Sequence, residues 1–436
     1  MGVATGSRLP PRSEICRLTE RDRFIWATGI EDTFVFDAHS RTNRTLDEYE
    51  LTDHYARWRE DLGLIGELGV SAARYGIPWY KANPSKGKWD WSFADDTLGR
   101  LLELGIEPIV DLVHYGTPAW IEGRFLHPDY PNYIAEFAAN LAQRFKGKVR
   151  WFTPFNEPRI AAYYCGKLGY WPPYARGWDG FVRLTLGICR GIVLTCHALD
   201  RIDPEIVRCH VDATDLYATD DPAREHEVRF RQELVFLALD LITGKVDDHH
   251  PLHGWLLMHG ASQRNLEWFL NHAIDLDVLG INLYPMYSFK KIGRDGQEIQ
   301  VRMPYSGEPD LVERLGEMYW ERYRRPLMIT ETASDGSIGR RMKWLANSTQ
   351  GCRNLMAKGV PMVGYTWWPL FSLVGWSYRR SSLPLSRYWV HMGLWDLDPR
   401  LDRVETPLVD AYRKLVRAGS PGIVRTPAMA GGAVVS

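Results

Sequence analysis

The sequence predicts an α/β fold that consists of a single (β/α)8 TIM barrel with loop insertions at its C-terminal face. Short apolar runs alternate with longer amphipathic stretches along most of the chain, which is typical of repeated β-α units around a parallel sheet. The length of 436 residues suits one such barrel with insertions. An open doubly wound sheet is the alternative, but no GxGxxG motif follows an early strand.

Eight apolar runs account for the eight parallel strands that close such a barrel. Each run is short, and helical or polar segments separate it from the next. In chain order, the predicted strands are Phe24–Gly29, Ala72–Ile77, Glu107–His114, Val149–Asn156, Ile206–Asp212, Val278–Leu283, Leu327–Glu331 and Met362–Trp367.

Helical patterns lie between several of these strands. Ala94–Leu104 is amphipathic and ends before Gly105, a residue type that commonly terminates helices. A second such pattern spans Tyr133–Phe145. We expect residues 1–20 to form a loose N-terminal extension, residues 21–418 the barrel, and residues 419–436 a loose C-terminal tail.

The composition limits the kinds of partner. The 53 Lys and Arg residues balance 54 Asp and Glu residues, so we expect no nucleic acid partner. No apolar run reaches the roughly 18 residues of a membrane helix, so we expect no membrane insertion. The 18 Trp and 21 Tyr residues suit carbohydrate, because both side chains combine an apolar face with a polar edge, although large barrels contain many aromatic residues in any case.

The six cysteines form no CxxC pair, which argues against a zinc ribbon or a thioredoxin-like motif. The first residues contain no apolar run of the signal-peptide kind, so we expect a cytoplasmic protein with free thiols. His249, His250 and His253 lie in a polar segment before a helix. We therefore expect neither a metal nor a cofactor.

Polar and aromatic side chains gather where the predicted strands end. Active sites of (β/α)8 barrels lie at the C-terminal ends of the strands, and six different strands contribute here. The residues concerned are Arg74, His114, Asn156, Glu157, Asn282, Glu331 and Trp367.

Two of these residues are carboxylic acids at the ends of the fourth and seventh strands. Glycoside hydrolysis needs one protonated carboxyl group and one ionised one on either side of the scissile bond. Glu157 and Glu331 can face each other across the barrel mouth in this way. Asn156 precedes Glu157 directly, and its amide can bind the sugar 2-hydroxyl. A solvated strand end or a buried ion pair is the alternative for either glutamate alone.

The surrounding segments resemble glycoside hydrolase family 1, the β-glucosidase family, from about Phe24 to Leu415. WFTPFNEP resembles the acid/base motif of this family, and LMITETA resembles its nucleophile motif, with Thr332 and Ala333 in place of the usual Asn-Gly. RYGIPWYKANP, GIEPIVDLVHYGTPAWI, DVLGINLYP and GYTWWPLFS resemble its second, third, sixth and eighth strand segments.

The resemblance implies a retaining β-glycoside hydrolase that cleaves a terminal β-linked sugar in two displacements, without a cofactor or metal. Glu157 would be the general acid/base and Glu331 the nucleophile. Arg74 would lie beside Glu331 and keep it ionised, and Tyr284 would donate a hydrogen bond to it. Asn156 would hold the 2-hydroxyl.

The resemblance also implies a set of sugar-binding residues. His114 would bind ring hydroxyls, and Trp367 would stack on the sugar. A cis peptide bond between Trp367 and Trp368 is expected from the same resemblance. The predicted substrate-binding residues are His114, Trp367, Trp376, Asn282, Glu31 and Tyr115.

The segments depart from the family at two glycone-binding positions. The family glutamine that grips two sugar hydroxyls after the first strand is missing from FIWATGIEDTFV, where Glu31 is a possible substitute. Gly375 stands where the family has a glutamate that reads the 4- and 6-hydroxyls. We therefore expect a glycone altered at carbon six, and an anionic one if Arg379 or Arg380 turns inward.

Other readings remain open at this point. A transglycosidase could use the same residues with a sugar or lipid hydroxyl in place of water. A catalytically silent carbohydrate-binding barrel is the alternative from a different class. The sugar, the aglycone and the oligomeric state are left open.

Overall fold

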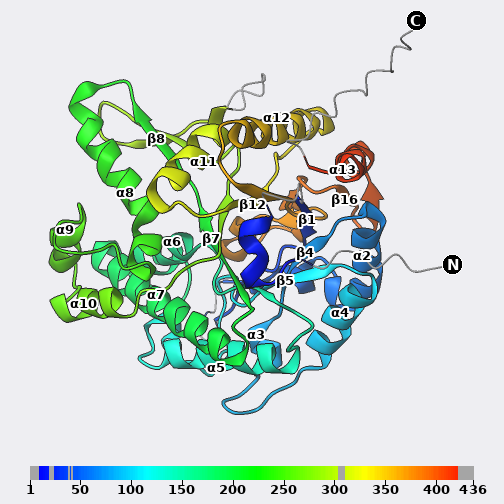
Figure 1. Cartoon of the computed structure of the whole chain (residues 1–436), viewed down its shortest axis with the longest axis horizontal. Coiled ribbons are helices and arrows are strands. Elements are labelled where there is room, and N and C mark those ends of the chain that lie inside the picture. The colour runs from blue at the N-terminus through cyan, green and yellow to red at the C-terminus, as the bar shows by residue number, and fades with distance from the viewer. Residues whose placement is uncertain (1–8, 19–23, 38–39, 41–42, 303–309, 421–436) are drawn as a thin grey trace, which may run out of the picture.

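The computed structural model describes residues 9–18, 24–37, 40, 43–302 and 310–420, and its centre is a closed barrel of eight parallel strands (Figure 1). All eight predicted strands are confirmed, with ends shifted by up to three residues. Around the barrel, the strands are β1 (Ile25–Gly29), β4 (Ala72–Gly76), β5 (Glu107–Asp111), β6 (Trp151–Thr153), β7 (Val207–Ala213), β9 (Val278–Asn282), β12 (Leu327–Thr332) and β13 (Met362–Trp367).

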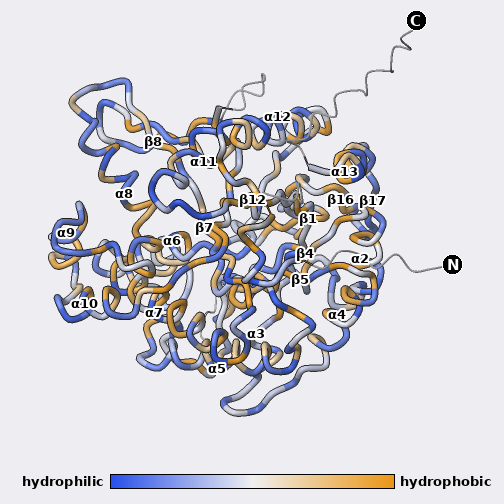
Figure 2. Tube along the Cα trace, in the orientation of Figure 1, coloured by the Kyte–Doolittle hydropathy of each residue, from blue (hydrophilic) through white to orange (hydrophobic). Residues whose placement is uncertain are grey.

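Helices surround the barrel, and both helices predicted by sequence are present as α4 and α5. Apolar residues recur along their inner faces between polar ones, as the alternating colours along the outer helices in Figure 2 show. The main outer helices are α2 (His54–Leu68), α4 (Ser92–Glu103), α5 (Tyr130–Arg144), α7 (Gly177–Ile202), α8 (Glu225–Ile242), α11 (Asp310–Tyr323), α12 (Ile338–Ala357) and α13 (Pro407–Ala418).

Helix α7 is the one helix among the described residues that is long and apolar enough to cross a membrane by length and composition. Two thirds of its most apolar window (67%) is buried inside the protein. Its apolar side packs against α5 and α8, so the fold itself accounts for its composition.

The N-terminal residues close the bottom of the barrel, so the prediction of a loose extension is wrong for residues 9–18. Leu9, Ile15 and Leu18 are buried together with the apolar side chains of the barrel interior. Pro10 accepts a hydrogen bond from the Trp151 indole at 3.1 Å. The short helix η1 (Arg12–Arg17) lies in front of the barrel centre in Figure 1 (dark blue). Residues 1–8 and 421–436 lie outside the described residues.

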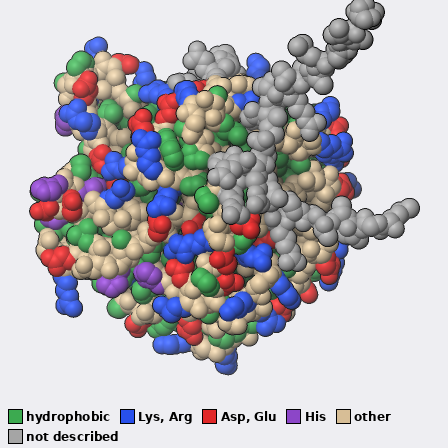
Figure 3. All heavy atoms as spheres, viewed as in Figure 1, with side chains coloured by type: hydrophobic (Ala, Val, Ile, Leu, Met, Phe, Trp, Pro, Cys, Tyr) green, Lys and Arg blue, Asp and Glu red, His purple; other side chains and the backbone are tan. Residues whose placement is uncertain are grey.

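Smaller elements make up the connections and the loops of the C-terminal face. On the face of the protein that Figure 3 shows, the side chains of Lys and Arg are intermixed with those of Asp and Glu. The small strands are β2 (Phe34–Val35), β3 (Leu46–Asp47), β8 (Leu216–Thr219), β10 (Phe289–Ile292), β11 (Glu298–Gln300), β14 (Leu373–Val374), β15 (Trp389–Val390), β16 (Trp395–Leu397) and β17 (Arg403–Glu405). The short helices are α1 (Glu48–Leu51), α3 (Trp79–Ala82), α6 (Pro158–Ala162), α9 (His253–Met258), α10 (Gln263–Asn271), η2 (Arg124–Leu126), η3 (Tyr163–Lys167), η4 (Pro222–Arg224), η5 (Trp376–Arg380) and η6 (Leu385–Arg387).

Candidate active site

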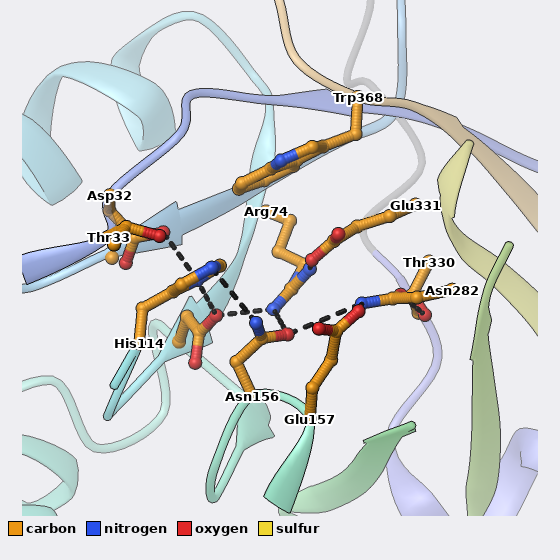
Figure 4. A network of polar contacts seen from close by, with 12 residues as sticks. Asp32, Thr33, Arg74, His114, Asn156, Glu157, Asn282, Thr330, Glu331 and Trp368 are labelled. Atoms are coloured by element: carbon orange, nitrogen blue, oxygen red, sulfur yellow. Dashed lines mark hydrogen bonds and ion pairs between the residues drawn. The ribbon is translucent and has the colours of Figure 1, made fainter. Parts of the chain in front are cut away.

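The C-terminal ends of the barrel strands bring the predicted polar residues into one buried network (Figure 4). Arg74 lies on β4, and Glu157 lies at the end of the short segment that follows β6. Asn282 ends β9, and Glu331 lies near the end of β12. The network therefore joins side chains that are far apart in the sequence and meet only because the sheet closes into a barrel.

Glu331 is held by two donors. The Arg74 guanidinium pairs with Oε1, and the Tyr284 hydroxyl donates to Oε2 at 2.7 Å. Burial raises the pKa of Glu331, while the charge of Arg74 and the hydrogen bond from Tyr284 oppose this rise. Both contacts favour the carboxylate form, as a nucleophile requires. The structure places Arg74 and Tyr284 where the sequence predicts them.

Glu157 lies in a different environment. Asn282 Nδ2 donates to Oε1 at 2.9 Å, and the Tyr115 hydroxyl donates to Oε2. Burial raises the pKa of Glu157 to about 7, and the nearby charge of Glu331 adds to this rise. No cation pairs with Glu157 among the described residues. Glu157 therefore keeps a proton at a pH where an ordinary glutamate has lost it.

Arg74 is the centre of the network, and one of its partners was not predicted. Its guanidinium pairs with Asp111 as well as with Glu331, and it donates to Asn156 Oδ1 at 2.7 Å. Asp111 ends β5, two residues after Ile109, which points into the barrel. Since side chains two apart on a strand share a face, this spacing is the signal that could have identified Asp111.

His114 forms one wall of the site. Its Nδ1 lies 2.8 Å from Asp32 Oδ1 and 3.2 Å from Asp111 Oδ2. Its Nε2 lies 2.9 Å from Asn156 Nδ2 and 3.3 Å from Glu31 Oε1. Each ring nitrogen therefore faces the polar atoms of the site. Asp32 is a further member that the sequence did not single out.

Trp368, not Trp367, faces the polar network, so the predicted position of Trp367 in the sugar-binding wall is wrong. The Trp368 ring stacks 6.0 Å from the His114 ring, at an interplanar angle of 6°. Trp367 points outward instead and donates to the Met392 carbonyl at 3.1 Å. The predicted cis bond is displaced in the same way, because the cis peptide joins Trp368 to Pro369. Side chains of neighbouring residues point to opposite sides of a strand. An error of one residue in the alignment therefore assigns the side chain that packs away from the site to the site itself.

Two groups of acidic and histidine side chains lie close enough to hold a metal, but ion pairs already occupy them. In the first group, Glu31, Asp32 and His114 contact one another as described above. In the second, Arg322 and His250 both contact Asp240. His249 is almost fully exposed and belongs to neither group. The absence of a metal and of a cofactor stays a prediction.

Known proteins that are similar to this chain include several β-glucosidases. The sequence model described as "Glycosyl hydrolase family 1" matches residues 26–185, which include Glu157. Beta-glucosidase 47 of Arabidopsis thaliana is 23% identical over 79% of this chain and 72% of its own length. A bifunctional beta-D-glucosidase/beta-D-fucosidase of Bifidobacterium breve is 34% identical over 31% of each chain.

The fold comparison agrees with the sequence comparison. The family 1 β-glucosidase from Thermotoga maritima superimposes with a TM-score of 0.80 at 19% identity, covering 91% of this chain and 98% of the other. Residues 26–185 thus match the family 1 model, and the chain resembles β-glucosidases in sequence and in fold.

Glu31, the possible substitute for the family 1 glutamine, lies in the network beside His114. Glu31 is buried beside His114, and its Oε2 accepts a hydrogen bond from the Trp368 indole at 3.2 Å. Its Oε1 accepts from the Thr33 hydroxyl at 2.6 Å. The predicted placement of Glu31 in the sugar-binding wall is therefore supported, and its role there stays a prediction.

The family 1 glutamate is absent at Gly375, but its position is not an empty space. The first carbon of a side chain at Gly375 would lie 3.4 Å from Val390 Cγ2 and 3.5 Å from the Tyr388 carbonyl, in ordinary contact with both. The ribbon of β14 and β15 supplies these atoms. The expectation that the glycone is altered at carbon six stays a prediction.

The two arginines after Trp376 behave differently. Arg379 turns inward and is buried, but it donates to the Tyr170 carbonyl at 3.3 Å and to the Tyr174 hydroxyl at 3.0 Å. Arg380 is turned outward and lies over the Tyr170 ring. Both Nη atoms of Arg379 therefore donate hydrogen bonds to the loop that contains Tyr170 and Tyr174.

Aromatic rings pack around Tyr115, whose hydroxyl contacts Glu157. Tyr115 contacts Trp376 at 5.4 Å and Trp171 at 5.3 Å between ring centres. Trp376 also packs against Tyr164 at 5.3 Å. Trp376 therefore packs against the tyrosine that contacts Glu157, and its predicted role in substrate binding stays a prediction.

Proposed function

We propose that this protein is a retaining β-glycosidase that uses Glu331 as nucleophile and Glu157 as general acid/base. The observation that carries the proposal is the unequal environment of the two carboxyl groups. Glu331 is paired with a cation and a tyrosine hydroxyl, whereas Glu157 has no cation and a pKa of about 7. Two carboxyl groups with opposite protonation states at one pH are what double displacement requires.

The first displacement follows from these assignments. A carboxylate oxygen of Glu331 forms a bond to the anomeric carbon as the bond from that carbon to the glycosidic oxygen breaks. Glu157 transfers its proton to the departing oxygen, so the aglycone leaves as a neutral alcohol. The product of this step is a glycosyl ester on Glu331 and an ionised Glu157.

The second displacement reverses the roles. Glu157, now a carboxylate, takes a proton from water as the water oxygen bonds to the anomeric carbon. The ester bond to Glu331 breaks, and Glu331 regains its negative charge beside Arg74. Two inversions give net retention. A sugar or lipid hydroxyl in place of water would give transglycosylation at the same residues.

The glycone is proposed to be uncharged. The carboxyl groups of Glu31 and Asp32 lie in the wall beside His114, and they disfavour a phosphate or uronate there. Both Nη atoms of Arg379 are engaged by Tyr170 and Tyr174. Expected ligands of the sugar are His114, Asn156, Glu31 and the face of Trp368. The cytoplasmic location also stays a proposal. Its support is that the six cysteines form no disulfide bond.

Azide rescue of two matched variants tests the proposal. Glu331→Ala should be inactive on an aryl β-glycoside, and added azide should restore turnover with an α-glycosyl azide as product, because azide fills the space of the nucleophile. Glu157→Ala should instead give a β-glycosyl azide, because azide then attacks the glycosyl ester. A β-configured product from Glu331→Ala overturns the nucleophile assignment. The absence of any aglycone burst from the unmodified protein would favour the silent barrel.

A further inference from the structure

The donors and acceptors around Glu157 determine which of its oxygens carries the catalytic proton. The argument begins at Arg74, since a guanidinium can only donate. Arg74 Nη2 lies 2.7 Å from the side chain of Asn156, so this atom of Asn156 is the amide oxygen. The same oxygen lies 3.4 Å from the side chain of Asn282, which must therefore present its NH2 group.

The orientation of Asn282 has a second support. Its other side-chain atom lies 2.7 Å from the Thr330 hydroxyl, which can donate to an amide oxygen. The NH2 group of Asn282 then faces Oε1 of Glu157 at 2.9 Å. An amide NH2 cannot accept a proton, so Oε1 remains a hydrogen-bond acceptor in both protonation states. The proton of the general acid therefore belongs on Oε2.

The other oxygen, Oε2, is the one that the Tyr115 hydroxyl contacts. We propose that Tyr115 is a positioning residue for the general acid/base, whose hydroxyl accepts from protonated Oε2 and donates to it once the proton has moved to the glycosidic oxygen. A tyrosine hydroxyl can do both, because it carries one hydrogen and two lone pairs. The inference rests on the proposed function of Glu157.

The proton balance of this exchange is simple. The O–H bond at Oε2 of Glu157 breaks as an O–H bond forms at the departing aglycone oxygen. The Tyr115 hydroxyl keeps its own hydrogen and rotates so that it points at the new carboxylate. In the second displacement, water gives its proton back to Oε2, and the hydroxyl rotates again to accept.

The surroundings of Tyr115 hold its hydroxyl in place. Its ring packs against His114, Trp171 and Trp376, with ring centres 4.8 to 5.4 Å away. Its backbone has a φ of 71°, a left-handed conformation that is strained for tyrosine. The next residue, Gly116, leaves room for Phe34, whose carbonyl would lie 2.4 Å from any added Cβ. Chain geometry and packing thus direct one hydroxyl at one oxygen.

The pH dependence of Tyr115→Phe tests the role. A hydrogen bond to a charged group stabilises the carboxylate by an amount equal to about one pKa unit. We expect the alkaline limb of the kcat/KM profile to move up by about one pH unit in Tyr115→Phe. Tyr319→Phe is the matched control, because that buried hydroxyl has no hydrogen-bond partner among the described residues. Its alkaline limb should not move.

A double-mutant cycle separates action through Glu157 from other effects. A 2,4-dinitrophenyl glycoside needs no acid to depart in the first step, so Glu157→Gln can still be assayed with it. Adding Tyr115→Phe to Glu157→Gln should change the rate of glycosylation less than twofold. An unmoved alkaline limb, or an undiminished effect in the Glu157→Gln background, overturns the inference. Azide rescue of Glu331→Ala is a separate measurement. If azide rescues that variant, the proposed function itself still holds.

Discussion

The indole nitrogen of Trp368 lies 3.2 Å from Oε2 of Glu31, which links the residue after the last barrel strand to the loop after the first. Strands β13 and β1 are neighbours in the closed barrel, so the contact spans the point where the last strand of the barrel pairs with the first. Because Glu31 is the possible substitute for the glycone-binding glutamine of family 1, this pair is expected to form one side of the sugar site.

Replacement of the two adjacent tryptophans should separate binding from stability. Trp368→Ala removes the stacking face and the donor to Glu31, so we expect kcat/KM to fall by about 100-fold or more. Trp367→Phe loses the bond to the Met392 carbonyl and part of the packing of a fully buried ring, so we expect about 2–3 kcal/mol less stability and little change in kcat/KM. Steady-state kinetics and urea unfolding measure both. The reverse result would restore the original assignment of Trp367.

Activity should depend on pH through both glutamates. The acid form of Glu157 is needed, and its pKa is raised to about 7. The fraction of protonated Glu157 is therefore complete well below pH 7, and kcat/KM should fall about tenfold per pH unit above it. The acid limb should reflect protonation of Glu331, although the measured values belong to the coupled pair. A pH–rate profile of kcat/KM checks this, and an alkaline limb near pH 4.5 would contradict it.

Arg74→Met should be strongly destabilising. It leaves the carboxylates of Asp111 and Glu331 buried without their shared cation, and such a loss costs about 3–5 kcal/mol. Adding Asp111→Asn removes one of the two unpaired charges, so it should recover part of the stability but none of the activity. The free energy of unfolding in urea measures both changes. If the second substitution destabilised the protein further, the shared-cation account would be wrong.

Gly375→Glu should not restore preference for plain glucose. The first carbon of the new side chain would already contact Val390 and the Tyr388 carbonyl, so the glutamate would have to fit against the β14–β15 ribbon. We expect lower stability and no gain in kcat/KM on an aryl β-glucoside. The measurement is a panel of aryl glycosides that includes 6-phosphorylated and uronic forms. A clear gain on glucoside would show that the ribbon can move aside.

Local patterns in the sequence were enough to predict the barrel and its two central carboxylates. Each strand of a parallel barrel is buried on both faces and appears as a short apolar run, so eight such runs were recognisable one at a time. Glu157 and Glu331 stand at the ends of two of those runs, and strand ends are where barrel sites form.

The same double burial explains the error at Trp367. When both faces of a strand are apolar, hydropathy does not indicate which face points inward. Trp367 and Trp368 are both fully buried, and only their neighbours distinguish them. The prediction for residues 9–18 was wrong for a related reason. Their apolar side chains pack against the bottom of the barrel, and no local sequence pattern shows this.

The sequence by itself thus determined the number and order of the strands and the identity of the two glutamates, since these depend on residues that are close together in the chain. Only the tertiary structure decided that Asp111 shares Arg74 with Glu331, that Glu31 receives the Trp368 indole and that Tyr115 meets Oε2 of Glu157. These relationships are hydrogen bonds and ion pairs between side chains from different strands. They depend on ångström-scale distances across the barrel mouth, which exist only once the whole sheet has closed.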